Sequence, residues 1–231
     1  MLTVGFQKPQ KQVIQGRSVS LVPLVAADHA EDLLVAATVP NRQEKYRYLA
    51  DLPPDTIEEA LSWAEKAEKS EDPMFFAVID QDTGKAVGRQ ALMRIDTTNG
   101  AAEIGNIYWG PAMARSIKAT EALFLTMEYI FDRLGYRRFE WKCDNNNEPS
   151  KIAANRFGFA YEGLFRQHFI IKGRNRDTAW FSVIDKEWPL LKTAYQIWLD
   201  DDNFDAEGKQ KVALSALTAK ALGRGNLPSL V

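Results

Sequence analysis

The chain of 231 residues can hold one domain with an appendage, since domains usually span roughly 50 to 250 residues. Hydrophobic residues make up 45% of it and charged residues 26%, which is typical of a globular protein and excludes a disordered one. The formal net charge is −2, and Lys and Arg are scattered among Asp and Glu, so nothing indicates a dedicated nucleic-acid surface.

The cysteine and histidine content narrows the kinds of site. One cysteine, Cys143, excludes an internal disulfide framework, and His29 and His168 are too few to complete a Cys/His zinc site with it. Residues 1–16 contain no apolar run typical of a signal peptide, and no segment approaches the roughly 18 apolar residues that span a bilayer. We therefore expect a cytoplasmic protein with no metal, membrane or nucleic-acid partner.

The first half of the chain alternates strand and helix signals. A short amphipathic helix is expected after Asp28, and a second helix follows a cap at Asp55 or Thr56, with acidic residues in its first turn. Two β-rich runs joined by a glycine-bearing loop predict a hairpin, which a third run extends into a meander. The predicted strands are residues 18–24, 75–80, 86–95 and 102–109.

The second half begins with a helix, because apolar positions recur with a helical period from Thr120 to Gly135. A shorter helix is expected between Pro149 and Gly158. The polar run 172–177, KGRNRD, is interpreted as a loop between two strands. The predicted strands of this half are residues 136–142, 164–171 and 178–184.

These elements divide the chain into an N-terminal arm over residues 1–17, an α/β domain over 18–189 and a helical tail over 190–231. Helices are expected in the tail near residues 190–200 and 205–222. Its Trp198 and Phe204 predict docking against the body or a partner, because exposed large aromatic side chains are disfavoured.

The chain carries the motifs EIG at 103–105, TEA at 120–122, LGYRRFEWKCD at 134–144, Asn147 with Ser150, and RFGFAYEG at 156–163. In these motifs and in the order of its elements it resembles the GNAT superfamily of acyl-CoA-dependent N-acyltransferases, and it looks like the branch that includes the ribosomal-protein N-terminal acetyltransferases. The resemblance implies an α/β fold, with a mainly antiparallel, twisted mixed sheet that splays between two central strands and carries helices on both faces. A doubly wound dinucleotide-binding sheet fits less well, since the chain lacks a G-x-G-x-x-G turn.

The resemblance also implies that acyl-CoA binds at the N-terminus of the central helix, where free main-chain N–H groups and the helix dipole favour the pyrophosphate. The loop pattern of the family, Q/R-x-x-G-x-G/A, falls on residues 114–119, where Ile117 stands in place of the glycine. Charged and hydroxyl side chains are expected to compensate. The residues expected to bind acyl-CoA are Arg115, Ser116, Ile117, Lys118, Ala119, Thr120, Asn147 and Tyr108. Tyr108 is included because a main-chain amide of residues 107–109 is expected to bind the acyl oxygen.

Two side chains are the candidates for catalysis. Many members of the family protonate the departing thiolate with a tyrosine that falls on Ala154 here, so Ser150 is the replacement candidate; a helix cap is its structural alternative. Glu103 is expected to accept the proton of the amine through water. There are two alternatives: Glu103 is a purely structural surface carboxylate, or Glu140 is the base.

We therefore expect acetyl transfer from acetyl-CoA to a primary amine by direct attack in a ternary complex. No acyl-enzyme is expected, because Cys143 has no evident activating partner and is interpreted as a buried structural thiol. The acceptor is a small-molecule amine or a protein N-terminus, and His168, Arg174 and Arg176 are candidates to line its site, although the arginines could instead pin a hairpin through ion pairs. Transfer of a larger acyl group and catalytically silent acyl-CoA binding are the alternative functions, and a homodimer stays open.

Overall fold

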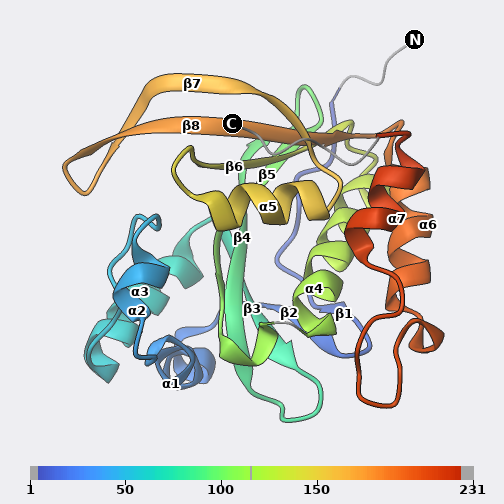
Figure 1. Ribbon diagram of the computed structural model, residues 1–231. Coiled ribbons are helices and arrows are strands. Elements are labelled where there is room, and N and C mark those ends of the chain that lie inside the picture. The colour runs from blue at the N-terminus through green and yellow to red at the C-terminus, as the bar shows by residue number, and fades with distance from the viewer. Residues whose placement is uncertain (1–4, 115, 225–231) are drawn as a thin grey trace.

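The computed structural model describes residues 5–114 and 116–224, in which one mixed sheet runs in the order β1-β2-β3-β4-β5-β6-β8-β7 (Figure 1). Its strands are β1 (Ile14–Gln15), β2 (Val19–Pro23), β3 (Met74–Asp80), β4 (Ala86–Asp96), β5 (Ala101–Trp109), β6 (Arg138–Asp144), β7 (Ala160–Ile171) and β8 (Arg174–Ile184). Neighbouring strands are antiparallel except β5 and β6, which are parallel. The expected mainly antiparallel mixed sheet is confirmed.

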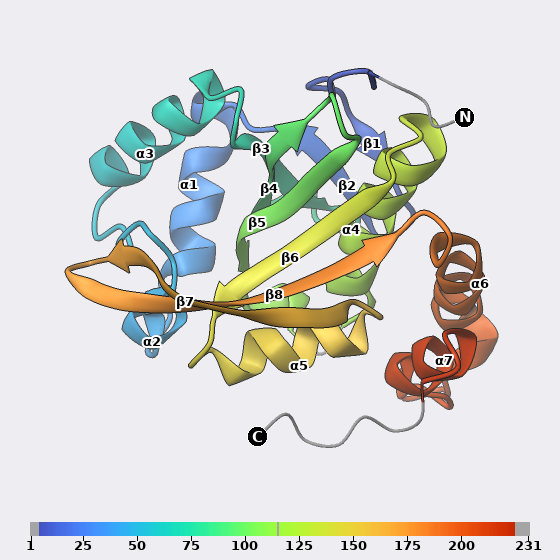
Figure 2. The same ribbon diagram turned by 90° about the horizontal axis from the view of Figure 1, so that it is seen from above.

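Helices cover both faces of this sheet, also as expected (Figure 2). They are α1 (Ala26–Ala37), α2 (Arg42–Tyr46), α3 (Ile57–Lys69), α4 (Ile117–Glu128), α5 (Glu148–Arg156), α6 (Trp188–Leu199) and α7 (Leu214–Ala221). Apolar residues of α1 and α3 form one hydrophobic cluster with the sheet, and those of α4 to α7 join a larger one on the other side. None of the described helices is long and apolar enough to cross a membrane.

Strand β3 shows how the sequence specifies two covered faces. Phe75 and Ala77 belong to the cluster of α1 and α3, whereas Phe76 and Val78 belong to the larger cluster. Because successive side chains of a strand point to opposite faces, a strand buried on both sides reads as a continuous apolar run. This strand therefore lies in the interior of the sheet.

The two parallel strands separate in the middle of the sheet. Their register ends at the pair Ile104–Trp141, although β5 and β6 both continue beyond it. The register between β4 and β5 shifts just after Gly105, and Asn106 has a φ of 49°. Such a β-bulge bends the strand that contains it. The expected splay between two central strands is therefore present.

The β7–β8 hairpin corrects the predicted polar loop over residues 172–177. Only Lys172 and Gly173 form the turn, with φ of 49° and 72°, and β8 already begins at Arg174. Two positive φ values suit a tight two-residue hairpin turn. The prediction was wrong because the first residues of β8 are exposed, so they lack the apolar alternation that marks a half-buried strand.

The C-terminal helices pack against the rest of the molecule. Trp198 is buried in the larger hydrophobic cluster and meets Phe204 edge to face at 5.3 Å between ring centres. The predicted helix over 205–222 is shorter than expected, since α7 begins only at Leu214. Before it the chain turns back on itself, with a bridge between Phe204 and Gln210. The glycine at 208 has a φ of 75°, which is incompatible with a continuous helix.

Candidate active site

A cavity of about 310 Å³ opens where β5 and β6 separate; we call it the central cavity. Among the predicted site residues it brings together Glu103, Asn147 and Ser150. Both Cys143 and Lys142 also line it. Because these two neighbours on one strand point to opposite faces of the sheet, the cavity connects the face that carries α5 with the face that carries α2.

Ser150 lies in the first turn of α5 but does not cap it. The cap is Asn147, whose Oδ1 accepts a hydrogen bond from the main-chain N–H of Ser150 at 3.2 Å. Ser150 Oγ instead accepts one from Trp141 Nε1 at 3.0 Å. An indole nitrogen only donates, so this bond leaves the hydroxyl proton of the serine for a different acceptor. The interpretation of Ser150 as the helix cap is therefore wrong.

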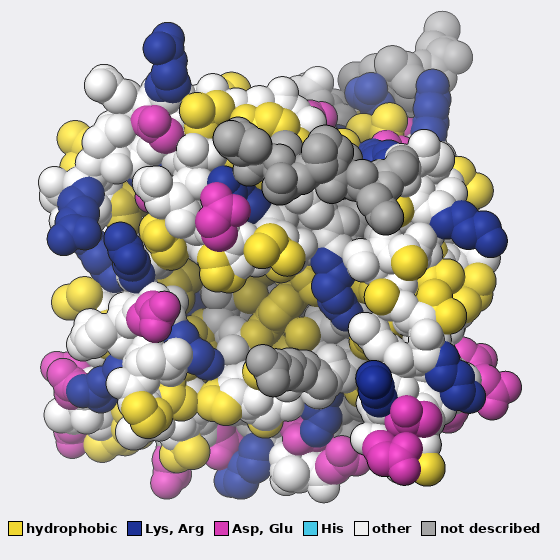
Figure 3. All heavy atoms as spheres, in the orientation of Figure 1, with side chains coloured by type: hydrophobic (Ala, Val, Ile, Leu, Met, Phe, Trp, Pro, Cys, Tyr) yellow, Lys and Arg dark blue, Asp and Glu magenta, His cyan; other side chains and the backbone are white. Residues whose placement is uncertain are grey.

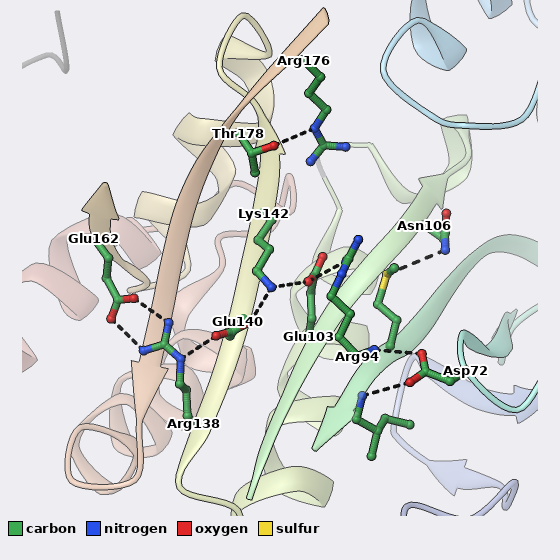
Figure 4. Close-up of polar contacts among 12 residues, drawn as sticks. Asp72, Arg94, Glu103, Asn106, Arg138, Glu140, Lys142, Glu162, Arg176 and Thr178 are labelled. Carbon is green, nitrogen blue, oxygen red and sulfur yellow. Dashed lines mark hydrogen bonds and ion pairs between the residues drawn. The ribbon is translucent and has the colours of Figure 1, made fainter. Parts of the chain in front are cut away.

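Glu103 is buried, with only 3% of its surface exposed. Its Oε2 forms ion pairs with Arg94 Nη1 and Lys142 Nζ, both at 2.8 Å (Figure 4). Lys142 also reaches Glu140 Oε2 at 2.6 Å, and Glu140 in turn pairs with Arg138. Glu103 is therefore no surface carboxylate, and its charge is balanced by two cations inside the cavity.

The alternation of β6 explains this row of charges. Arg138, Glu140 and Lys142 are two residues apart and so share one face of the sheet. Glu103 on β5 is the register partner of Glu140 and lies on the same face. Glu140 is not among the described residues that line the central cavity. Sequence reasoning did not single out Lys142, although this spacing of two could have revealed it.

Cys143 lies on the other side of β6, in the larger hydrophobic cluster, and is 4% exposed. Burial raises the pKa of its thiol to about 11, against a smaller opposing effect of the Ser150 hydroxyl. A thiol with this pKa stays protonated at neutral pH, and it is the thiolate that acts as a nucleophile.

A second cavity, of about 840 Å³, lies at the N-terminus of α4; we call it the α4 cavity. Of the predicted residues, it is lined by Ser116, Ile117, Ala119 and Thr120. The space-filling view shows a hollow with hydrophobic side chains in the face that carries α5 (Figure 3). Ser116 Oγ caps α4 by accepting from Lys118 N at 3.3 Å, so the helix begins three residues before the predicted Thr120. The first turn of a helix leaves main-chain N–H groups without intrahelical partners, which suits an anion.

Two of the predicted acyl-CoA residues, Lys118 and Tyr108, direct their side chains away from this cavity. Lys118 Nζ lies 2.7 Å from Asp80 Oδ2, so its charge is already balanced. Tyr108 turns toward α1, where its hydroxyl donates to the carbonyl oxygen of Ala36 at 3.0 Å, which leaves only its main chain near the splay. Arg115 lies outside the described residues.

Arg156, the last residue of α5, lines the α4 cavity and was missed by sequence reasoning. Both of its terminal nitrogens donate to Thr120 Oγ1 at 3.1 Å, and its guanidinium lies 5.1 Å from the centre of the Trp198 ring. Within the described part of the chain it has no carboxylate partner. Arg156 is the first residue of the RFGF motif, and this position could have identified it from the sequence.

The three candidate acceptor residues lie at different places on the β7–β8 hairpin. Arg176 lines the central cavity, whereas Arg174 is exposed beside the turn. His168 is packed against Phe169, with 3.7 Å between ring centres. Burial, together with nearby cations of which Arg176 is the strongest, lowers the pKa of His168, so the imidazole is neutral at pH 7. In residues 5–114 and 116–224 no three His, Cys, Asp or Glu side chains gather closely enough to hold a metal ion.

Comparison with known proteins gives consistent similarities. A family model described as "Acetyltransferase (GNAT) domain" matches residues 19–160. The crystal structure of a GCN5-related N-acetyltransferase from Brucella melitensis is 54% identical, with a TM-score of 0.92 over 94% of this chain and 98% of that one.

Two curated bacterial proteins match more partially. The uncharacterized N-acetyltransferase p20 of Bacillus licheniformis is 33% identical over 117 residues, which is 49% of this chain and 63% of p20. YdaF of Bacillus subtilis (strain 168), provisionally described as a ribosomal N-acetyltransferase, is 29% identical over 109 residues, which is 46% of this chain and 57% of YdaF. The chain therefore spans less than two thirds of the length of these curated relatives.

Proposed function

Since the chain belongs to the GNAT acetyltransferase family and is an acyltransferase, we propose that it transfers an acetyl group from acetyl-CoA to a primary amine. The separation of β5 and β6 beyond the pair Ile104–Trp141 carries this proposal. It opens a passage between the faces of the sheet, so that a thioester can enter from the side of α5 and an amine from the side of α2. Both reactants then meet in one ternary complex.

The cosubstrate binds by its pyrophosphate to the first turn of α4. Ser116, Ile117 and Ala119 offer main-chain N–H groups there, and the Thr120 hydroxyl, which accepts from Arg156, can donate its own proton. Arg156 adds a positive charge to the same cavity. The amide nitrogen of Asn147 is the group that meets the pantetheine arm, because its amide oxygen already caps α5.

In the transfer step the nitrogen of the neutral amine attacks the carbonyl carbon of the thioester, and a new N–C bond forms. The amine proton passes to Glu103 through a water molecule, and main-chain amides around Tyr108 stabilise the oxyanion. The C–S bond then breaks and releases CoA as a thiolate. Ser150 donates its proton in a hydrogen bond to that sulfur, while Trp141 holds the hydroxyl in place. No acyl group is carried by Cys143.

A panel of acyl-CoAs and amines tests the proposal, with release of free thiol as the rate and mass spectrometry to identify the product. Acetyl-CoA should be the preferred donor, and the product should be the N-acetylated amine. Faster transfer from propionyl-CoA or longer donors would favour the alternative of a larger acyl group. Tight CoA binding by calorimetry without any product would favour a silent acyl-CoA-binding protein.

A further inference from the structure

Arg176 is a cation in the central cavity that forms no direct ion pair with any described residue. Its Nε donates to Thr178 Oγ1 at 3.1 Å, and within the described residues no carboxylate lies within 4.0 Å of it. The close-up shows the contrast: Arg94 and Arg138 each reach a carboxylate, whereas the dashed line from Arg176 ends on a threonine (Figure 4).

A partly buried guanidinium of this kind is suited to an incoming anion. It carries five N–H donors in a planar fork, of which the Thr178 hydroxyl satisfies one. Removing a charge from water costs free energy that an opposite charge can offset. Guanidinium forks match carboxylate and phosphate oxygens in a bidentate geometry. A ligand with such a group would complete the hydrogen bonding of Arg176.

The surroundings of Arg176 favour a negative ligand as well. The described charged residues that line the central cavity are Lys45, Arg94, Lys142, Arg176, Glu103 and Asp144. Glu103 is taken by two of the cations, and Asp144 Oδ1 accepts from the main chain and side chain of Asn146 at 2.8 and 3.0 Å. The ring of Phe169 lies close to both Arg94 and Arg176, with its centre 5.5 and 5.7 Å from their guanidinium carbons. The cavity is therefore positive on its β7–β8 side.

We propose that the acceptor is an amine that also carries an anionic oxygen group, a carboxylate or a phosphate, and that Arg176 binds this group. The inference rests on the proposed function, because it places the amine beside Glu103 and the anion beside Arg176 in one cavity. Arg176 is then a specificity-determining residue for the acceptor, and it takes no part in proton transfer.

Matched pairs of acceptors test this inference: leucine and leucinamide, phosphoethanolamine and ethanolamine, and short peptides with Glu or Gln at the second position. The wild type should prefer the anionic member of at least one pair by roughly ten- to a hundredfold in kcat/KM, which is the range of a charge-assisted hydrogen bond. Arg176→Gln should abolish the preference, mainly through KM, and Arg176→Lys should restore part of it. Arg174→Gln is the matched control, since that arginine is exposed on the same strand, and it should behave as wild type.

A binding experiment separates failure of this inference from failure of the proposed function. N-acetylleucine and N-acetylleucinamide are titrated calorimetrically into the protein saturated with CoA, together with the acetylated forms of the other pairs, so that no turnover is needed. At least one anionic product should bind more tightly, and only when Arg176 is present. Equal affinities of all charged and neutral partners, or a preference that survives Arg176→Gln, would overturn the inference even if acetyl transfer is observed. The preferred pair distinguishes a carboxylate from a phosphate and a small molecule from a peptide.

Discussion

Trp141 Nε1 donates a hydrogen bond to Ser150 Oγ at 3.0 Å, and the Ser150 hydroxyl does not cap α5, the helix to which the serine belongs. The hydroxyl is oriented by a group that cannot accept its proton. Asn147 caps α5 in its place, so the two neighbouring polar residues have different tasks. A substitution at each should therefore have a different consequence.

For Ser150→Ala we expect kcat to fall roughly a hundredfold, because a hydrogen bond to charge that develops in the transition state is worth about 3 kcal/mol. The affinity for CoA and the melting temperature should change little, since the cap is retained. Asn147→Ala is the control with the opposite pattern: it should lose about 1 kcal/mol of stability along with CoA affinity. Steady-state kinetics, calorimetry and thermal melts measure these values. Normal turnover in Ser150→Ala would remove the serine from the mechanism.

For Glu103→Gln we expect slower turnover whose deficit shrinks as the pH rises, because a larger fraction of the acceptor amine is then already neutral. The variant should also lose about 3 kcal/mol of stability, since a buried carboxylate between two cations is removed.

Glu140→Gln separates these two effects. It also removes a partner of Lys142, but from outside the central cavity, so it should be destabilised yet keep the wild-type pH profile. The measurement is kcat/KM against pH for the three proteins. A Glu103→Gln enzyme that matches the wild type at every pH would reduce Glu103 to a structural partner of Lys142.

Sequence reasoning reached the fold because the fold depends on local patterns and on spaced motifs. The apolar run of β3, the Thr56 cap of α3 and the order of the elements all appear directly in the sequence. The run 172–177 was misread because the exposed end of a hairpin carries the same polar residues as a loop.

The candidate site was less accessible to such reasoning, because it is assembled across the sheet. Glu103 and Ser150 could be named from their motifs, and they do line one cavity. The sequence does not reveal that Lys118 lies against Asp80, or that Arg156 reaches Thr120 from another helix. These pairs are separated by more than thirty residues, so no local pattern records them.

For Arg156→Gln we expect CoA to bind roughly ten- to a hundredfold more weakly, since a charged hydrogen bond contributes about 1.5–3 kcal/mol. Lys118→Gln should have a smaller effect, because the ammonium of Lys118 is held by Asp80. Calorimetric titration of CoA into each variant at two salt concentrations makes the comparison. If Lys118→Gln weakens binding as much as Arg156→Gln, the pyrophosphate contacts the lysine side chain itself.

The pair of Lys118 and Asp80 predicts a pH dependence of stability. Burial alone would raise the pKa of Asp80, but the hydrogen bond from Lys118, with smaller contributions from Asp82 and Thr83, lowers it overall. A carboxyl whose pKa is lowered by folding stabilises the protein above its unfolded pKa, and this stability is lost as the pH falls through the folded value. Lys118→Gln should therefore be destabilising at pH 7, and its penalty should fade below about pH 4. Denaturant unfolding from pH 3 to pH 7 checks this; a penalty independent of pH would show that the ion pair is not its source.

Cys143 offers the last test, because it lies in the reaction cavity yet should not react. Burial raises the pKa of its thiol to about 11, so at pH 7 the nucleophilic thiolate is scarce. Incubation with acetyl-CoA alone should leave the intact mass unchanged, and alkylation of the folded protein by iodoacetamide should accelerate as the pH approaches 11. Cys143→Ala should retain acetyl transfer, which separates a structural thiol from a catalytic one. A stoichiometric acetyl adduct on Cys143 that passes to the amine would instead establish a covalent intermediate, and direct attack in the ternary complex would have to be abandoned.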